Sequence, residues 1–167
     1  VIIHFLELVY ANLEHEREQD NDMPAPITQN AYEHSTRWQN NNYDPVTDGF
    51  VRDDTPQNDI REIFRKGWTA SEKGANITFE VEGSCLAVQY RKSVVQPTPI
   101  AKAIVDGDEE HAMILDGNFE ETWGDSLHLD TLAEHLPYGK HTVRIELIET
   151  HEDDKVPFYL VSVIASH

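Results

Sequence analysis

The 167-residue sequence contains one cysteine and few basic residues, and each shortage excludes a class of protein. Because Cys85 is alone, no disulfide can form within the chain and a cysteine-rich zinc site is excluded. Only 13 lysines and arginines stand against 31 aspartates and glutamates, which gives a net charge of −18. Such a surface repels phosphate backbones and anionic lipids, so we expect neither nucleic acid nor a membrane as partner.

Long apolar runs are also missing, and no segment has the length needed to cross a bilayer. The opening VIIHFLELVY is interrupted by His4 and Glu7, and no basic region precedes it. We therefore expect no signal peptide in this chain, which leaves a cytoplasmic protein and a secreted part of a longer protein as alternatives. Hydrophobic residues make up 39% and charged residues 26%, as in a soluble globular domain with at most a small appendage.

Residues 1–19 have the periodicity of an amphipathic helix. Its start carries no N-capping residue and its first turn is already apolar, so we expect the tail of an upstream domain. The polar, proline-bearing segment 20–26 (DNDMPAP) cannot continue a helix and is predicted to be a linker to a module over 27–167. The apolar stripe of the helix consists of Ile2, Phe5, Leu6, Val9 and Leu13.

Beyond residue 26 the hydrophobic period changes from helical to alternating. Residues 77–81 and 86–90 alternate apolar and polar side chains on either side of Gly83-Ser84, which predicts a tight hairpin. Asp106-Gly107 predicts a second hairpin, between strands at 100–105 and 110–115.

Further strands are predicted toward the C-terminus. Residues 143–147 alternate after a Tyr-Gly-Lys turn, and Phe158–Ala165 is apolar on both faces, which is typical of a central strand covered on both sides. Segments near 31–38, 50–51 and 68–70 add candidate edge strands. Seven to nine short strands separated by turns predict a mainly β fold, an antiparallel β-sandwich or jelly roll preceded by one α-helix.

The stretch WGDSLH (Trp123–His128) contains the letters of a serine-hydrolase signature, Gly-Asp-Ser-Leu. The residues before it are too polar for the buried strand that presents such a serine, and too few residues follow to complete an α/β domain. We therefore favour a loop that enters a strand at Leu127–Leu129 over a nucleophilic Ser126. Asp108-Glu109-Glu110-His111 matches the Asp-x-x-His partner motif, and we interpret it as an acidic hairpin tip.

Other parts of the chain resemble the SGNH/GDSL hydrolases. Val1–Glu14 (VIIHFLELVYANLE) is similar to the last helix of an SGNH domain. FRKGWTASEKGANITFEVEGSCLAVQYRKS (Phe64–Ser93) and LPYGKHTVRIEL (Leu136–Leu147) resemble the jelly-roll module appended to bacterial SGNH-type carbohydrate esterases. The resemblance implies an accessory module whose catalytic residues belong to the upstream domain.

Aromatic and acidic residues in the predicted loops are the candidates for ligand binding. Sugar sites combine aromatic faces with a few carboxylates, amides or histidines. Trp123 has Asp125 and His128 nearby, and Trp38 neighbours Tyr43 across an asparagine run. Trp68 is a candidate for which we favour packing.

Acidic turns provide candidate oxygen ligands for a structural calcium ion. They are Asp106, Asp108, Glu109 and Asp116, but no regular calcium-loop pattern is present and solvated turns are the alternative. The histidines at 111, 128, 135, 141 and 151 lack metal-ligand spacing, so we expect surface or edge positions for them. Cys85 is expected to be a small buried hydrophobe.

Three hypotheses follow for the function. The first is a non-catalytic, carbohydrate-binding or scaffolding module of an SGNH-type carbohydrate (acetyl) esterase, with glycan or the upstream esterase domain as partner. The second is a self-contained hydrolase that uses Ser126. The third is a structural domain that forms homo-oligomers through the N-terminal helix, since a helix this short is marginal without a partner.

Overall fold

The computed structural model describes residues 2–13, 30 and 32–167. Helix α1 spans Ile2–Leu13, within the predicted helix, and the side chains of its stripe residues Ile2, Phe5, Leu6 and Val9 are exposed. The rest of the predicted helix and the predicted linker 20–26 lie outside the described residues. Among the residues that the structure covers, no helix has the length and apolar character needed to span a bilayer.

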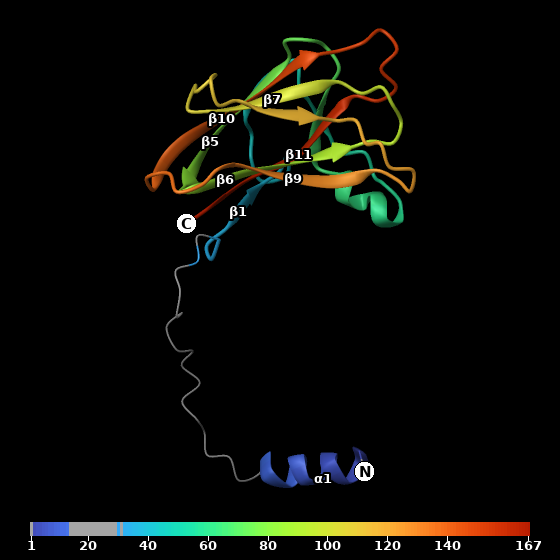
Figure 1. The fold of residues 1–167 in the computed structure, drawn as a ribbon, viewed down its shortest axis with the longest axis vertical. Helices are drawn as coiled ribbons and strands as arrows, with labels where there is room; N and C mark the ends of the chain where they lie inside the picture. The colour runs from blue at the N-terminus through green and yellow to red at the C-terminus, as the bar shows by residue number, and fades with distance from the viewer. Residues whose placement is uncertain (1, 14–29, 31) are drawn as a thin grey trace.

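Two antiparallel sheets face each other across one hydrophobic core (Figure 1), which confirms the predicted β-sandwich. The β11 sheet has the order β3 (Val51–Asp53), β4 (Gly67–Ala70), β11 (Phe158–Ser166), β6 (Cys85–Lys92) and β9 (Ser126–Ala133), and β1 (Thr36–Trp38) also pairs with β11. The β10 sheet has the order β2 (Val46–Asp48), β5 (Asn76–Gly83), β10 (Gly139–Glu149), β7 (Ile100–Val105) and β8 (Met113–Asp116).

The core forms because alternate residues of the strands point between the sheets. Ile77, Phe79 and Val81 of β5 are buried, whereas Glu80 and Glu82 between and beside them are exposed. Trp68 from the opposite sheet meets Phe79 edge-on, with ring centroids 5.2 Å apart. A large apolar side chain buried in this way stabilises the fold by about 1.5–3 kcal/mol. Cys85 is also buried, as predicted.

Strand β11 is buried on both faces, as its continuous apolar sequence predicts. Phe158 and Leu160 belong to the core between the sheets, whereas Tyr159 and Val161 face the other side of the β11 sheet. That outer side is covered by η1, a short 3-10 helix (Asp59–Phe64), whose Phe64 packs against Tyr159 with ring centroids 6.5 Å apart. η1 therefore adds a partial third layer beside the sandwich.

The two predicted hairpins have different outcomes. Asp106-Gly107 does turn β7 into β8, which pair antiparallel, so that prediction is confirmed. The hairpin at Gly83-Ser84 is wrong, because β5 pairs with β10 and β2 in one sheet while β6 pairs with β11 and β9 in the other. The turn is a corner between the two sheets. Ser84 N–H donates to the carbonyl of Ser166 at 2.8 Å, which fixes the corner to the end of β11.

Candidate functional site

A groove of about 570 Å³ lies beside η1, where β6 ends and β9 begins. Four apolar side chains along it are exposed: Ile60 (87%), Ile63 (47%), Val95 (49%) and Trp123 (71%). We call this cavity the Trp123 groove, and the remaining residues along it are Gln57, Arg61, Phe64, Arg91, Val94, Gly124, Asp125, Ser126 and Leu127. Exposed apolar side chains gathered around a cavity of this size are typical of a ligand or interaction site.

The loop that carries Trp123 is fixed at several points. Ser93 N–H donates to the carbonyl of Gly117 at 2.8 Å, and Phe119 N–H donates to the carbonyl of Ser93 at 3.0 Å. The ring of Phe119 meets Trp123 edge-on, with centroids 5.5 Å apart. Gly124 then has φ of 146°, a conformation that side chains rarely allow. The loop thus presents the indole in a defined orientation.

Asp125 holds this loop against the end of β6. Its Oδ1 accepts hydrogen bonds from Ser93 Oγ at 2.9 Å and from Val94 N–H at 3.1 Å, and its Oδ2 lies 3.9 Å from Arg91 Nε. The guanidinium of Arg91 lies over the Tyr159 ring, 5.3 Å from the centroid. Burial lowers the pKa of Arg91, and the carboxylate of Asp125 opposes that shift. Asp125 therefore lines the groove but is already engaged in positioning it.

His128, the third residue predicted beside Trp123, does not share the groove. Strand alternation directs Leu127 to the outer cluster with Val161 and directs His128 to the opposite face, against Tyr90 with ring centroids 5.4 Å apart. Its Nε2 lies 3.4 Å from Asp130 Oδ1, and Tyr90 Oη donates to Asp130 Oδ2 at 3.0 Å. Burial raises the pKa of Tyr90, and the charge of Asp130 adds to that shift.

The other predicted aromatic contacts pack into the sandwich. Trp68 is 1% exposed, so the favoured interpretation of this candidate, packing in the core, is confirmed. Tyr43 is half-buried and stacks on Phe79 with centroids 5.6 Å apart, and Trp38 meets Tyr43 edge-on at 6.4 Å. Asn40 is buried and its Nδ2 donates to the carbonyls of Asp53 and Gly67. The sequence alone therefore does not show which of the three tryptophan side chains are exposed, whereas the structure does.

The four acidic metal candidates are not brought together. Asp106 binds His141, Asp108 binds His111 at 2.8 Å, and Glu109 binds Lys102 at 2.6 Å. Asp116 accepts hydrogen bonds from Asn118. Over residues 2–13, 30 and 32–167, no three His, Cys, Asp or Glu side chains are grouped closely enough to hold a metal ion.

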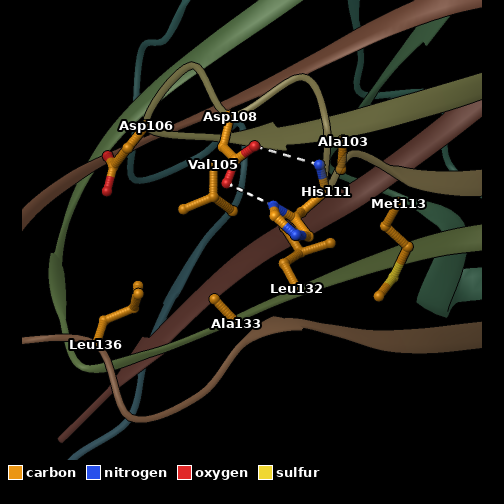
Figure 2. A pocket seen from close by; sticks show the side chains of 9 residues that line it. All are labelled: Ala103, Val105, Asp106, Asp108, His111, Met113, Leu132, Ala133 and Leu136. Atoms are coloured by element: carbon orange, nitrogen blue, oxygen red, sulfur yellow. Dashed lines mark hydrogen bonds and ion pairs between the residues drawn. The ribbon is translucent and has the colours of Figure 1, made fainter.

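A second, smaller cavity of about 200 Å³ lies between the β7–β8 loop and β9 (Figure 2). Its apolar lining includes Met113, Leu132 and Leu136. Figure 2 shows Asp108 directed to His111, whereas Asp106 points away from that pair. This arrangement explains why the two carboxylates do not act as one ligand set.

Asp106 and His141 tie the β7–β8 turn to β10. His141 Nδ1 lies 2.7 Å from Asp106 Oδ2, and its Nε2 lies 2.9 Å from the carbonyl of Pro137. Both partners are acceptors, so only the protonated imidazolium donates both bonds. The hydrogen bond to Asp106 raises the pKa of His141. For Asp106, burial favours a higher pKa, but hydrogen bonds from His141 and Thr142 outweigh it and lower the pKa.

The stabilising effect of His141 is expected to depend on pH. Because its pKa is raised on folding, the contribution is complete below the unfolded value of about 6.5 and is lost as the pH rises through the folded value. Replacing His141 by glutamine should lower the unfolding free energy by about 1 kcal/mol at about pH 5.5 and by less at about pH 8.5. Urea denaturation of both proteins at the two pH values measures this, and an equal loss at both would contradict it.

Comparison with solved structures places this fold among known proteins. The chain is 54% identical to a two-domain esterase (CEX) active on acetylated mannans, co-crystallised with mannopentaose, with a TM-score of 0.85. That alignment covers 99% of this chain and 43% of the esterase. A second structure of a two-domain esterase (CEX) active on acetylated mannans gives 53% identity, coverage of 99% and 44%, and a TM-score of 0.87. The chain thus spans less than half the length of these relatives.

A more distant structure shares the fold alone. It is the CBM36-1 domain of a multidomain xylanase from the hindgut metagenome of Trinervitermes trinervoides, at 9% identity and a TM-score of 0.50, with 78% of this chain and 94% of that domain covered. Neither the protein-family models nor the curated proteins compared with the chain gave a match. With its sandwich fold and 54% identity to part of a two-domain esterase, the chain is a β-sandwich accessory module of the carbohydrate-esterase type.

Proposed function

We propose that this chain is a non-catalytic module that binds glycan for an attached esterase domain, with the Trp123 groove as the binding surface. The exposed indole of Trp123 on a fixed loop is the observation that carries this proposal. Aromatic faces contact the apolar faces of pyranose rings, and a groove of about 570 Å³ falls within the range of small-ligand sites. The negative charge of the chain favours a neutral glycan over an acidic one.

We propose a glycan of the mannan class as the ligand of this β-sandwich module. The 54%-identical esterase is active on acetylated mannans and was crystallised with mannopentaose. Because that identity extends over almost the whole chain, we propose that this module also binds the mannan backbone. The ester hydrolysis itself would belong to the attached domain.

We assign residues 1–19 to the last helix of that upstream domain, 20–26 to a linker and 27–167 to the module. The alignment with the esterase extends over 99% of the chain and therefore includes α1. The exposed stripe of Ile2, Phe5, Leu6 and Val9 supports the assignment, because such a short helix needs a surface to pack against. Contact between two copies of the chain is the alternative, and analytical ultracentrifugation distinguishes a monomer from a dimer.

A hydrolase that uses Ser126 is not supported. Ser126 begins β9 and lines the groove, but His128 lies on the other face of the strand. Within the described part of the chain, the histidine rings that form hydrogen bonds contact carboxylates or the carbonyl of Pro137, and none contacts Ser126 Oγ as a base would. Among the residues that the structure describes, Ser126 therefore has no histidine partner of the kind that nucleophilic catalysis requires.

Isothermal titration of the chain with mannopentaose tests the proposed function. We expect saturable binding of mannopentaose and weaker binding of xylopentaose, whose rings lack the C6 hydroxymethyl group. Binding should be abolished or strongly reduced in a chain unfolded by urea, which controls for nonspecific heats. Absence of binding to mannopentaose and to acetylated manno-oligosaccharides would contradict the proposal.

A further inference from the structure

We infer that the Trp123 groove recognises O-acetyl groups on its glycan, so that the module binds acetylated mannan more tightly than the same chain without acetyl groups. The inference rests on the proposed function and specifies the ligand of the same site. It comes from two features of the groove: branched aliphatic side chains that line it together with the indole, and a guanidinium, that of Arg61, which forms no ion pair within the described residues.

The aliphatic feature consists of Ile60 and Ile63 on η1 and Val95 on the loop after β6, all exposed. A bare pyranose ring offers hydroxyl groups at its edge, and a hydroxyl that loses water against an aliphatic side chain without a new hydrogen bond costs free energy. An O-acetyl group presents a methyl group at the same position. Burying that methyl group against isoleucine and valine is favourable.

The polar feature is a side chain that is free to donate hydrogen bonds. Arg91, the other arginine along the groove, lies over the Tyr159 ring and 3.9 Å from Asp125 Oδ2. Arg61, by contrast, forms no ion pair within the part of the chain that is described, whereas Arg65, one turn further along, pairs with Glu62 at 2.6 Å. A guanidinium donates five N–H groups and accepts none. An ester carbonyl is an acceptor without a donor, so it suits Arg61 better than a hydroxyl does.

The two features lie next to each other in the sequence of η1, where Arg61 stands between Ile60 and Ile63. One short helix therefore supplies both the apolar contact for the methyl group and a donor for the carbonyl. Trp123, which lines the same groove, supplies the face for the ring that carries the acetyl group. A module built in this way would keep the attached esterase on acetylated stretches and release it as acetyl groups are removed.

The test compares one set of acetylated manno-oligosaccharides with the same set after alkaline deacetylation, by isothermal titration with the full chain. We expect at least about fivefold tighter binding of the acetylated set, because each buried methyl group adds apolar contact. Equal affinities for the two sets would overturn the inference and leave the proposed function standing. Binding of neither set would overturn both.

Substitutions distinguish acetyl recognition from ring binding. The double variant Ile60→Thr and Val95→Thr replaces apolar surface by hydroxyls at exposed positions, and should bring the affinity for the acetylated set to within about twofold of the deacetylated one. Val46→Thr, a change at an exposed position on the β10 sheet, is the control and should alter neither affinity. Circular dichroism shows that each variant is folded. An unchanged preference in the double variant would overturn the inference.

Discussion

Replacement of Trp123 by alanine is expected to lower the affinity for mannopentaose at least about tenfold, because the apolar contact of an aromatic platform is worth about 1.5–3 kcal/mol. The same change should leave the unfolding free energy within about 0.5 kcal/mol of the original, since surface substitutions rarely exceed that value. Trp123 is largely exposed, and its ring meets that of Phe119 edge-on. Titration calorimetry and urea denaturation measure the two effects separately.

Tyr138→Ala is the matched control for this prediction. Tyr138 is also an exposed aromatic residue, but it follows the end of β9, whereas the groove lies where β9 begins. Its removal should leave the affinity for mannopentaose unchanged. An equal loss of affinity in both variants would show that exposed aromatic residues contribute nonspecifically. An unchanged affinity in Trp123→Ala would contradict the proposal that the Trp123 groove binds the glycan.

Trp68→Ala is expected to have the largest effect on stability, a loss of about 3–5 kcal/mol in unfolding free energy. Trp68 is almost completely buried, pairs with Leu160 in β11 and meets Phe79 from the opposite sheet. Alanine would leave a cavity between the two sheets that the paired strands cannot close. Because domains of this size have only about 5–15 kcal/mol of stability, the variant should be close to unfolding. Urea denaturation followed by circular dichroism measures the loss.

Trp68→Phe separates packing from ligand binding. Phenylalanine keeps an apolar ring between the sheets, so we expect a smaller loss of stability than in Trp68→Ala and an unchanged affinity for mannopentaose. A specific loss of affinity in a fully folded Trp68→Phe protein would contradict the assignment of Trp68 to the core.

Much of the fold could be predicted from the sequence because alternation depends only on neighbouring residues. The strands around Phe79, Ile145 and Leu160 lie where the hydrophobic pattern places them. Alternation does not identify the partner of a strand, however. A Gly-Ser turn between two alternating segments fits a hairpin and a corner between sheets equally well, and the choice at Gly83 depends on contacts with β10 and β11, far away in the sequence.

The candidate site residues stay a prediction, and the structure shows only which of them lie along one groove. Trp123 and Asp125 do lie together, because they are neighbours on one loop. His128 lies apart from them, because successive side chains of β9 point to opposite faces of the sheet. Ile60, Arg61 and Ile63 were missed, since the segment before Phe64 contains no strong motif. Two isoleucines three residues apart in a polar segment, followed by a buried phenylalanine, were the available signal for a short helix packed on a sheet.

The most direct test of the account is to map the binding of mannopentaose on the folded chain by ¹H–¹⁵N NMR. We predict that the indole N–H of Trp123 and the backbone amides of Gly124–Leu127 and of η1 shift together and saturate with one affinity, as a single groove requires. Shifts confined to the second cavity, around Asp108, His111 and Leu132, or no shifts at all, would contradict the claim that this module binds glycan through the Trp123 groove.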